Sequence, residues 1–235
     1  MKNRYRVVII GGGVIGTATA FYLAKSGIRN VAVLEKDYLS SGSTGRCGGG
    51  IRQQWSERMN VRLAMRSVDH FKRFESEVGF DIEYFQGGYL LLAYTEEEVS
   101  LFEKNTKMQQ EEGLDVVLLS REETAKIFPF INLTNVKATA YCPSDGHANP
   151  HLTTFAYARA AQRMGVEILT HTSAERILTK GGRIIGVQTN KGQIGAEVIV
   201  NAAGGYSHEV GRMADIDLPT ESYKHQIFVT EPLEH

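Results

Sequence analysis

Three glycines near the amino terminus have the spacing of a phosphate-binding turn. Gly11, Gly13 and Gly16 form the pattern G-x-G-x-x-G. In this pattern the first glycine permits a tight turn, the second lets the backbone approach a pyrophosphate, and the third lets a helix pack closely on a strand. Glu35 lies about 20 residues further on, where a carboxylate accepts hydrogen bonds from ribose hydroxyls and disfavours a 2′-phosphate. Together these residues predict a site for a dinucleotide other than NADP.

The elements around these glycines have the order that such a site requires. Residues 7–10 form a continuous apolar run, which is typical of a buried parallel strand. A helical stretch over residues 14–25 follows and stops at Gly27, and residues 31–34 read as a second buried strand. Strand, glycine turn, helix and strand make a complete βαβ unit. The alternative is a Rossmann-like fold with an empty site.

A second glycine-rich stretch, "STGRCGGGIRQQW", occupies residues 43–55. Successive glycine amides can bind an anion or lie against a flat ring, and a plain linker would not need Arg46, Arg52 and Trp55. A nicotinamide-binding domain would usually continue with a helix and a strand at this point. The stretch therefore favours the longer cofactor FAD over NAD. The alternative is a mobile loop of glycine and serine.

Composition indicates a globular chain and argues against several classes of partner. The chain has 235 residues, 42% of them hydrophobic, and a formal net charge of −1. No bulk basic field would attract nucleic acid, and no apolar run reaches the roughly 20 residues of a membrane helix. Two cysteines, Cys47 and Cys142, make no disulfide framework, so we expect a reduced, cytoplasmic compartment without a signal peptide. Residues 233–235 resemble the start of a polyhistidine expression tag.

The rest of the chain alternates helical and extended patterns. We expect a helix from an N-cap at Ser56 to about residue 78, two strands around Gly87 and Gly88, and helices with capping boxes at Thr95 and Ser120. The later patterns, in chain order, are a helix over 150–164, an antiparallel meander over 175–194, a second buried strand at 197–201 and a last strand within 223–232.

Four segments together resemble the D-amino-acid oxidase-like FAD-dependent oxidoreductases, in particular the branch with glycine oxidase, sarcosine oxidase β subunit and proline dehydrogenase β subunit. These segments are "VVIIGGGVIGTATAFYLAKSG…VAVLEK", "GSTGRCGGGIRQQW", "QGGYLLLA" and "VIVNAAGGYS". The resemblance covers residues 4–232. Members of the family are longer, and their C-terminal part supplies a glycine-rich loop over the flavin. The resemblance therefore implies a chain truncated at the C-terminus.

The resemblance implies an α/β fold in which a Rossmann-type FAD-binding domain is interleaved with a smaller, incomplete α+β substrate domain. Residues 1–80 and 143–215 are expected to build the FAD-binding domain. Residues 81–142 and 216–232 are expected to build the substrate domain, with 233–235 as the remnant of a tag.

The resemblance also implies which residues contact FAD. They lie at the glycine turn, after the second strand, along the second glycine-rich stretch and at two later crossings of the cofactor. They are Gly11, Gly13, Val14, Ile15, Gly16, Glu35, Lys36, Ser43, Thr44, Arg46, Gly49, Gly50, Ile51, Ala174, Ala202, Ala203 and Gly204. Ala174 stands where the family usually has valine.

Arg52 aligns with an arginine that holds the substrate carboxylate in the sarcosine oxidase relatives. The alternative for Arg52 is a surface or phosphate-facing cation. His147 and His151 lack metal-ligand spacing, so we expect no metal and interpret both as solvated or capping side chains. Some β-subunit relatives attach FMN to a histidine in the region of His151. We expect Trp55 and Phe71 in the core.

The resemblance implies an enzyme that oxidises an amino acid or N-substituted amine of the glycine, sarcosine or proline type by hydride transfer to FAD. The expected partner is that small molecule, with no nucleic acid and no membrane span; homo- and hetero-oligomers both stay open. Two alternatives remain. One is a non-catalytic, cofactor-carrying subunit of a heteromeric dehydrogenase, and the other is an NAD-dependent dehydrogenase.

Overall fold

The computed structural model describes residues 2–228 and 231, which fall into two compact units. The first unit contains the described residues of Met1–Gly48, Val78–Ile82 and Asn149–His235. The second unit contains Gly49–Glu77 and Glu83–Ala148. Each unit has its own sheet and its own buried apolar cluster.

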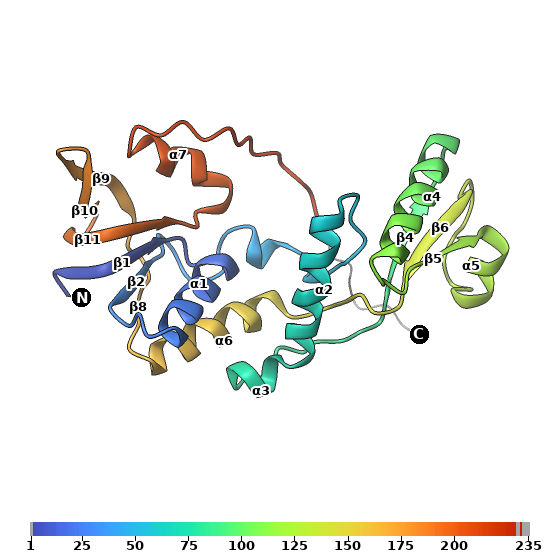
Figure 1. Ribbon diagram of the computed structural model, residues 1–235, viewed down its shortest axis with the longest axis horizontal. Helices are drawn as coiled ribbons and strands as arrows, with labels where there is room; N and C mark the ends of the chain where they lie inside the picture. Colours follow the sequence, from blue (N-terminus) through green and yellow to red (C-terminus); the bar gives the residue numbers. More distant parts are fainter. Residues whose placement is uncertain (1, 229–230, 232–235) are drawn as a thin grey trace. The chain divides into compact units, whose positions relative to one another are not determined.

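The sheet of the first unit has the strand order β8-β2-β1-β11-β10-β9 (Figure 1). Strands β8, β2, β1 and β11 run parallel, and β10 and β9 continue the sheet antiparallel. The bounds are β1 (Arg4–Ile10), β2 (Val31–Leu34), β8 (Glu167–Leu169), β9 (Ala174–Lys180), β10 (Arg183–Thr189) and β11 (Gly192–Asn201). Because parallel strands end at one edge, the residues that follow β2, β1 and β11 are neighbours there.

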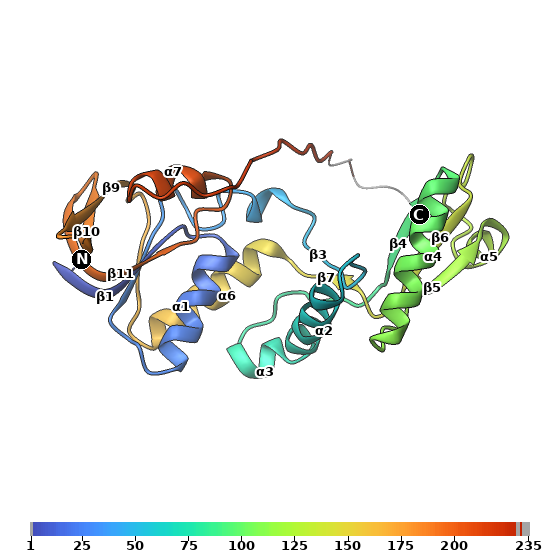
Figure 2. The ribbon, with the colours of Figure 1, turned by 45° about the horizontal axis from the view of Figure 1, so that its top comes forward.

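Two helices lie side by side on this sheet, α1 (Val14–Lys25) and α6 (Pro150–Arg163) (Figures 1 and 2). The ring centroids of Phe21 in α1 and Tyr157 in α6 are 5.5 Å apart. Asn149 begins α6 by accepting hydrogen bonds from backbone amides of its first turn. A third helix, α7 (Ser207–Arg212), packs through Val210. The short 3₁₀ turns are η1 (Thr44–Arg46) and η2 (Gly204–Tyr206).

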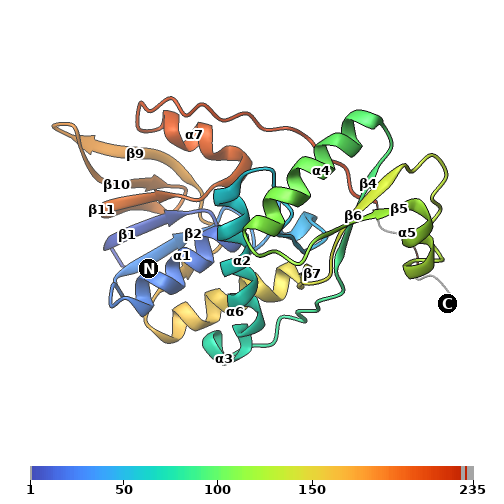
Figure 3. The ribbon, with the colours of Figure 1, turned by 45° about the vertical axis from the view of Figure 1, so that its right-hand side comes forward.

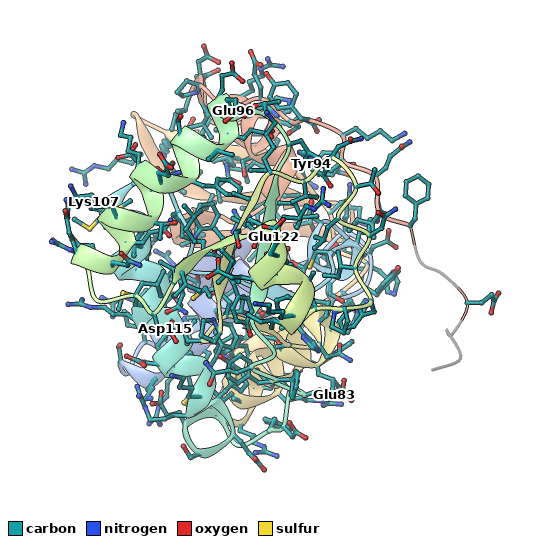
Figure 4. All side chains as sticks on the ribbon, turned by 90° about the vertical axis from the view of Figure 1, so that its right-hand side faces the viewer. Glu83, Tyr94, Glu96, Lys107, Asp115 and Glu122 are labelled. Carbon is teal, nitrogen blue, oxygen red and sulfur yellow. The ribbon has the colours of Figure 1, made fainter. Side chains whose placement is uncertain are left out.

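The second unit is built on an antiparallel sheet in the order β4-β6-β5, with α4 lying along it (Figure 3). Its core joins Val61 of α2 to Val116, Ala140 and Cys142 of the sheet region. Figure 4 labels Glu96 in the first turn of α4 and Glu122 on α5. The bounds are β3 (Gly50–Ile51), α2 (Arg58–Lys72), α3 (Phe74–Val78), β4 (Tyr89–Ala93), α4 (Glu96–Glu111), β5 (Val117–Ser120), α5 (Arg121–Ile127), β6 (Ala138–Cys142) and β7 (Gly146–His147).

Most predicted elements are confirmed. The βαβ unit, the helix after Pro150, the antiparallel meander of β9, β10 and β11, and both capping boxes are present. The predicted helix from Ser56 to residue 78 is wrong in detail. The observed helix begins at Arg58 with Glu57 as N-cap, and a break at Arg73 divides the segment into α2 and α3.

The two predicted strands around Gly87 and Gly88 are also only half correct. β4 is present, but before the glycines the backbone makes a single bridge, between Phe85 and His147. Gly88 has a φ of +81°, so the chain turns there instead of continuing as a strand. The predicted last strand is wrong for residues 223–228, which have no strand structure. Its remaining residues 229, 230 and 232 lie outside the described chain.

The observed units differ from the expected domain boundaries. Residues 49–77 and 143–148 were expected in the FAD-binding domain, but they pack in the second unit. The reason is that α2 places Val61 in the second core and that Arg58 and Arg62 pair with Glu112 after α4. Residues 216–228 were expected in the substrate domain, but they follow the first unit, where Ser222 donates a hydrogen bond to the carbonyl of Gly205 at 2.6 Å.

Candidate functional site

Gly11 and Gly16 have no room for a side chain. Gly11 directly follows β1 and has a φ of +118°, and a Cβ atom there would lie 2.3 Å from the carbonyl oxygen of Ala202. A Cβ on Gly16 would lie 1.9 Å from the carbonyl oxygen of Gly11. Both atoms would overlap backbone, so these positions require glycine for the tight turn and the close helix packing that the sequence predicts.

Gly13 has a different role, because its own backbone is unstrained. It is the N-cap of α1, with φ −79° and ψ −177°, and it supplies no side-chain cap. Thr44 caps the helix instead, because its Oγ1 accepts a hydrogen bond from the Val14 amide at 3.2 Å. A Cβ on Gly13 would point at this oxygen from 3.0 Å. The first turn of α1 also contains no acidic side chain, so its positive end suits an anion.

Glu35 follows β2 and is turned toward the glycine loop by backbone hydrogen bonds. Its Oε2 accepts from the Gly12 amide at 2.8 Å, and its Oε1 accepts from the Asp37 amide at 2.9 Å. The side chain is buried. Oε1 also accepts from the Ser41 hydroxyl at 3.4 Å, so Oε2, which has one protein donor, is the oxygen that can accept a further bond from a ribose hydroxyl. Its contact with a ribose stays a prediction.

A third segment comes to the same edge of the sheet after β11. The Ala202 amide donates to the carbonyl of Ile10 at 2.9 Å, which places Ala202 beside the glycine turn. Ala203 and Gly204 follow, and Gly204 has a φ of +56°. The first unit therefore brings together the predicted residues of the glycine turn, of the end of β2 and of the end of β11. Sequence reasoning missed Tyr206, whose ring lies 3.8 Å below the Nζ of Lys36.

Ser40 holds the loop that carries Ser43, Thr44 and Arg46. Its amide donates to the carbonyl of Gly12 at 3.0 Å, and its carbonyl accepts from Gly45 at 2.9 Å. Its hydroxyl pairs with Nδ1 of His151 at 2.7 Å. Ser40 is 1% exposed with a φ of +64°, so this tie fixes a strained turn. His151 is exposed, as a solvated side chain should be, and in addition it holds this loop through Ser40.

The remaining predicted residues of this unit have side chains that are exposed or lie further from the glycine turn. The side chains of Ser43 and Arg46 are exposed. The Ile15 side chain is 67% exposed on the outer face of α1, which leaves its backbone for the predicted contact. Ala174 begins β9 opposite Thr189. Two residues before Ala174, the Thr172 amide donates to the carbonyl of Glu35 at 2.8 Å, which brings the start of β9 toward Glu35.

Gly49, Gly50 and Ile51 belong to the second unit. Gly49 has a φ of +68°, and its carbonyl accepts from Ala148 at 3.0 Å. Gly50 and Ile51 form β3 and pair with β7. A Cβ on Gly50 would lie 3.2 Å from the ring of Tyr89, so the small residue lets that ring approach the backbone.

Arg52 lies close to two aromatic rings of the second unit. Its guanidinium carbon is 4.6 Å from the ring centroid of Trp55 and 5.9 Å from that of Tyr89. The Trp55 indole N–H donates to the carbonyl of Arg52 at 3.0 Å. No carboxylate of the described residues pairs with Arg52. The expectation that Trp55 is core is wrong, because its side chain is 40% exposed and stacks with Arg52 instead.

Sequence reasoning also missed a buried carboxylate behind this arginine. Asp145 is fully buried and accepts from the Gln53 amide at 2.8 Å. It also accepts from the side-chain amides of Gln53 and Gln54, at 3.0 and 3.1 Å. Asp145 lies 92 positions from Gln53, so no local pattern marks the pair.

Other candidate groups do not form a site. Among the described residues, no three His, Cys, Asp or Glu side chains come together as metal ligands. None of the helices in the described part of the chain is both long and apolar enough to cross a bilayer. Cys47 is exposed and Cys142 is buried, and both are free thiols.

The fold and the glycine turn define a dinucleotide-binding protein of the Rossmann type. Comparison with known families narrows this class. The family described as "FAD dependent oxidoreductase" matches residues 6–235, and the chain belongs to it. The cofactor of this family is FAD, which confirms the flavin prediction and sets aside the alternative of an NAD-dependent dehydrogenase.

Individual relatives agree with the branch that the sequence resembles. Sarcosine oxidase subunit beta of Rhizobium meliloti (strain 1021) is 35% identical over 99% of this chain and 57% of its own. The crystal structure of L-proline dehydrogenase from P. horikoshii is 38% identical, with a TM-score of 0.85 over 92% of this chain and 57% of its own. Glycine oxidase from Geobacillus kaustophilus is 29% identical, with a TM-score of 0.81 over 90% of this chain and 58% of its own. The chain thus spans little more than half the length of these relatives.

Proposed function

We propose that the protein containing this chain is an FAD-dependent enzyme that oxidises a small amino acid or N-substituted amine, of the glycine, sarcosine or proline type. Three observations support the proposal. The chain belongs to an FAD-dependent oxidoreductase family. The relatives are named for sarcosine, proline and glycine. The third observation, which carries most weight, is an arginine that contacts two aromatic rings and has no carboxylate partner among the described residues.

The residues of the first unit fit the cofactor. The glycine turn is free of side chains where backbone must come close, and the first turn of α1 presents amides without a competing acid. Glu35 is held at the end of β2, where a ribose is expected. Gly11, Gly13 and Val14 would lie along the pyrophosphate, with Ala202 to Gly204 beside them. When bound, FAD accepts a hydride from the carbon next to the substrate nitrogen.

The part assigned to Arg52 is orientation. A guanidinium can hold a carboxylate with two parallel hydrogen bonds, a geometry that lysine cannot copy. The rings of Trp55 and Tyr89 support the guanidinium by cation–π contact, and no described carboxylate occupies its N–H groups, which leaves these donors for a substrate. A substrate gripped by its carboxylate has few orientations left, so its reacting C–H bond can be presented reproducibly.

The substitution Arg52→Lys tests this role in the flavin-loaded natural protein. Two substrate pairs differ only in the carboxylate, namely proline with pyrrolidine and sarcosine with dimethylamine. Arg52→Lys should lower kcat/KM for the carboxylate-bearing member by about 10- to 10³-fold, because one or two charge-assisted bonds are lost. The other member should be unaffected. Arg46→Lys is the control, since it lies in the FAD loop and should change flavin retention instead.

The assignment of Arg52 fails if Arg52→Lys lowers kcat/KM equally for both members of a pair, or for neither. A change in the flavin spectrum of this variant would mean that Arg52 contacts the cofactor instead of the substrate.

A second candidate is a cofactor-carrying subunit that does not oxidise an amine by itself. It is favoured by one observation, that the Rhizobium relative is named as a subunit. The discriminating experiment supplies the isolated, flavin-loaded protein with sarcosine, glycine or proline and an artificial dye as electron acceptor. Dye reduction by the single protein supports the first proposal. Dye reduction only after a partner protein is added supports the second.

A further inference from the structure

The segment that carries Arg52, directly after β3, is held in place by Asp145. This carboxylate has no exposed surface, and its Oδ1 accepts both the Gln53 amide and the Gln53 side-chain amide. The Gln53 amide belongs to the peptide group that contains the Arg52 carbonyl. That carbonyl in turn accepts the indole N–H of Trp55. Asp145 therefore restrains the backbone at Arg52 itself and not only a neighbouring loop.

A second connection runs from Asp145 to the other ring. Oδ2 of Asp145 accepts from Nε2 of Gln54, and the same Nε2 donates to the carbonyl of Tyr89 at 3.0 Å. Gln54 is 5% exposed, and its Oε1 has no hydrogen-bond partner among the described residues. The Gln54 side-chain amide is thus held through its nitrogen alone. The carbonyl of Asp145 also accepts from the Gly88 amide at 2.9 Å, directly before Tyr89.

We propose that Asp145 is the positioning residue for Arg52, because it joins the segment of Arg52 and Trp55 to the start of β4 with Tyr89. The inference deepens the proposed function, since it concerns the same carboxylate-binding arginine. Asp145 would not touch the substrate. It would set the plane of the guanidinium, and so the selectivity for substrates that carry a carboxylate.

The substitution Asp145→Asn tests this role with little change of shape. Asparagine replaces one acceptor oxygen by an NH₂ group, which then faces the N–H donors of Gln53 or Gln54. In the flavin-loaded natural protein, Asp145→Asn should lower kcat/KM for proline and sarcosine by about 5- to 50-fold, with pyrrolidine and dimethylamine changed less than about twofold. The double variant with Arg52→Lys should be no worse than Arg52→Lys alone, since Asp145 acts through Arg52.

A control variant separates this effect from lost stability. Glu98→Ala removes the capping box of α4 in the same unit, where Glu98 accepts from the Thr95 amide, and leaves the Asp145 contacts in place. It should lower the unfolding temperature and leave the preference between proline and pyrrolidine unchanged. If Asp145→Asn yields no folded protein, Gln54→Met replaces it, because this change removes only the link to Tyr89 and should cause the same selective loss in smaller measure.

Trp55 gives a readout that does not depend on catalysis. It is the only tryptophan of this chain, and subtracting the spectrum of Trp55→Phe isolates its fluorescence in a longer protein. Asp145→Asn should shift the emission of Trp55 and increase its quenching by acrylamide, because the ring loses its fixed contact with Arg52. Glu98→Ala should change neither quantity.

The outcomes distinguish this inference from the function on which it rests. If Arg52→Lys shows no preference change, the carboxylate role of Arg52 is wrong, and the Trp55 fluorescence still decides whether Asp145 positions the arginine. If Arg52→Lys behaves as expected but Asp145→Asn leaves both selectivity and Trp55 fluorescence unchanged, the positioning role is overturned. An equal loss for proline and pyrrolidine in Asp145→Asn would overturn it as well.

Discussion

The hydroxyl of Thr44 caps the amide of Val14, so the loop after β2 closes the first turn of the helix that follows β1. The two residues are 30 positions apart, and a Cβ on Gly13, in the turn that is expected to face a pyrophosphate, would lie 3.0 Å from the same hydroxyl oxygen. The glycine turn is therefore in contact with the start of the second glycine-rich stretch, through Val14 and Thr44. A change at either residue should alter cofactor binding before it alters the fold.

The first prediction uses Gly13→Val. The backbone at Gly13 is extended and suits any residue, so the protein should fold. The branched side chain would displace Thr44 and fill the approach to the pyrophosphate, so flavin should be lost on purification. The ratio of flavin to protein absorbance measures this directly. Thr44→Val is the partner variant, and it should weaken flavin binding less because the approach stays open. Full FAD occupancy in Gly13→Val would contradict the assigned role of this turn.

The second prediction compares two glycines by the space around them. Gly16→Ala places a Cβ against the carbonyl of Gly11, whereas Gly42 has open space around it and no positive φ. Gly16→Ala should reduce the free energy of unfolding by about 2 to 4 kcal/mol, and Gly42→Ala should change it by less than about 0.5 kcal/mol. Urea unfolding of both variants gives the comparison. Equal stabilities would show that helix α1 does not need the close approach.

The third prediction concerns the two thiols. Burial is the main cause that raises the pKa of the Cys142 thiol, to about 12, while Cys47 is exposed. Alkylation with iodoacetamide in the folded state should therefore modify Cys47 and spare Cys142, and denaturant should expose both. Mass spectrometry of peptides reads the result. Rapid modification of Cys142 without denaturant would mean that the second unit opens easily.

The same shift fixes the sign of a pH effect on stability. An unfolded cysteine loses its proton near its ordinary pKa of about 8.5, whereas folded Cys142 keeps it up to about 12. The unfolded state then binds fewer protons, so the stabilising contribution of the neutral thiol is present below the ordinary pKa and is lost as the pH rises toward 12. Cys142→Ala should flatten the alkaline part of the stability curve.

The fourth prediction addresses acid. Hydrogen bonds from Arg62 and Arg58 lower the pKa of Glu112 to about 2. The contribution of this carboxylate to stability is therefore present above its ordinary pKa of about 4.3 and is lost as the pH falls toward 2. Glu112→Gln should make the unfolding temperature less dependent on pH in that window. Above the window, the pH dependence of the variant and of the parent should be nearly the same. Parallel curves for Glu112→Gln and the parent would contradict the pairing of α2 with the end of α4.

The sequence predicts the first unit well because its signals are local. Apolar runs and the glycine spacing act within one element or one turn of this unit, as the capping boxes at Thr95 and Ser120 do in the second unit, and the structure reproduces all of them. The structure adds the packing of Gly11 against Ala202, which arises because parallel strands bring their ends to one edge.

The sequence does not predict contacts between distant segments. Ser40 and His151 are 111 positions apart, and Gln53 and Asp145 are 92 apart, so neither pair leaves a periodic pattern. Trp55 was misjudged for a related reason. A large aromatic residue usually packs in a core, and only the position of Arg52 shows that this ring serves as the support of a cation.

The fifth prediction concerns anaerobic reduction of the bound flavin by an amino acid, which is the reaction proposed for this protein. The purified natural protein should be yellow, and mass spectrometry of the cofactor released by denaturation should identify FAD. Sarcosine, glycine and proline are then added one at a time without oxygen, and the visible absorbance of the flavin is followed. We expect bleaching by at least one of the three, and much slower bleaching by the matching amine without a carboxylate. A colourless protein, a different released cofactor, or FAD that no amine bleaches would contradict it.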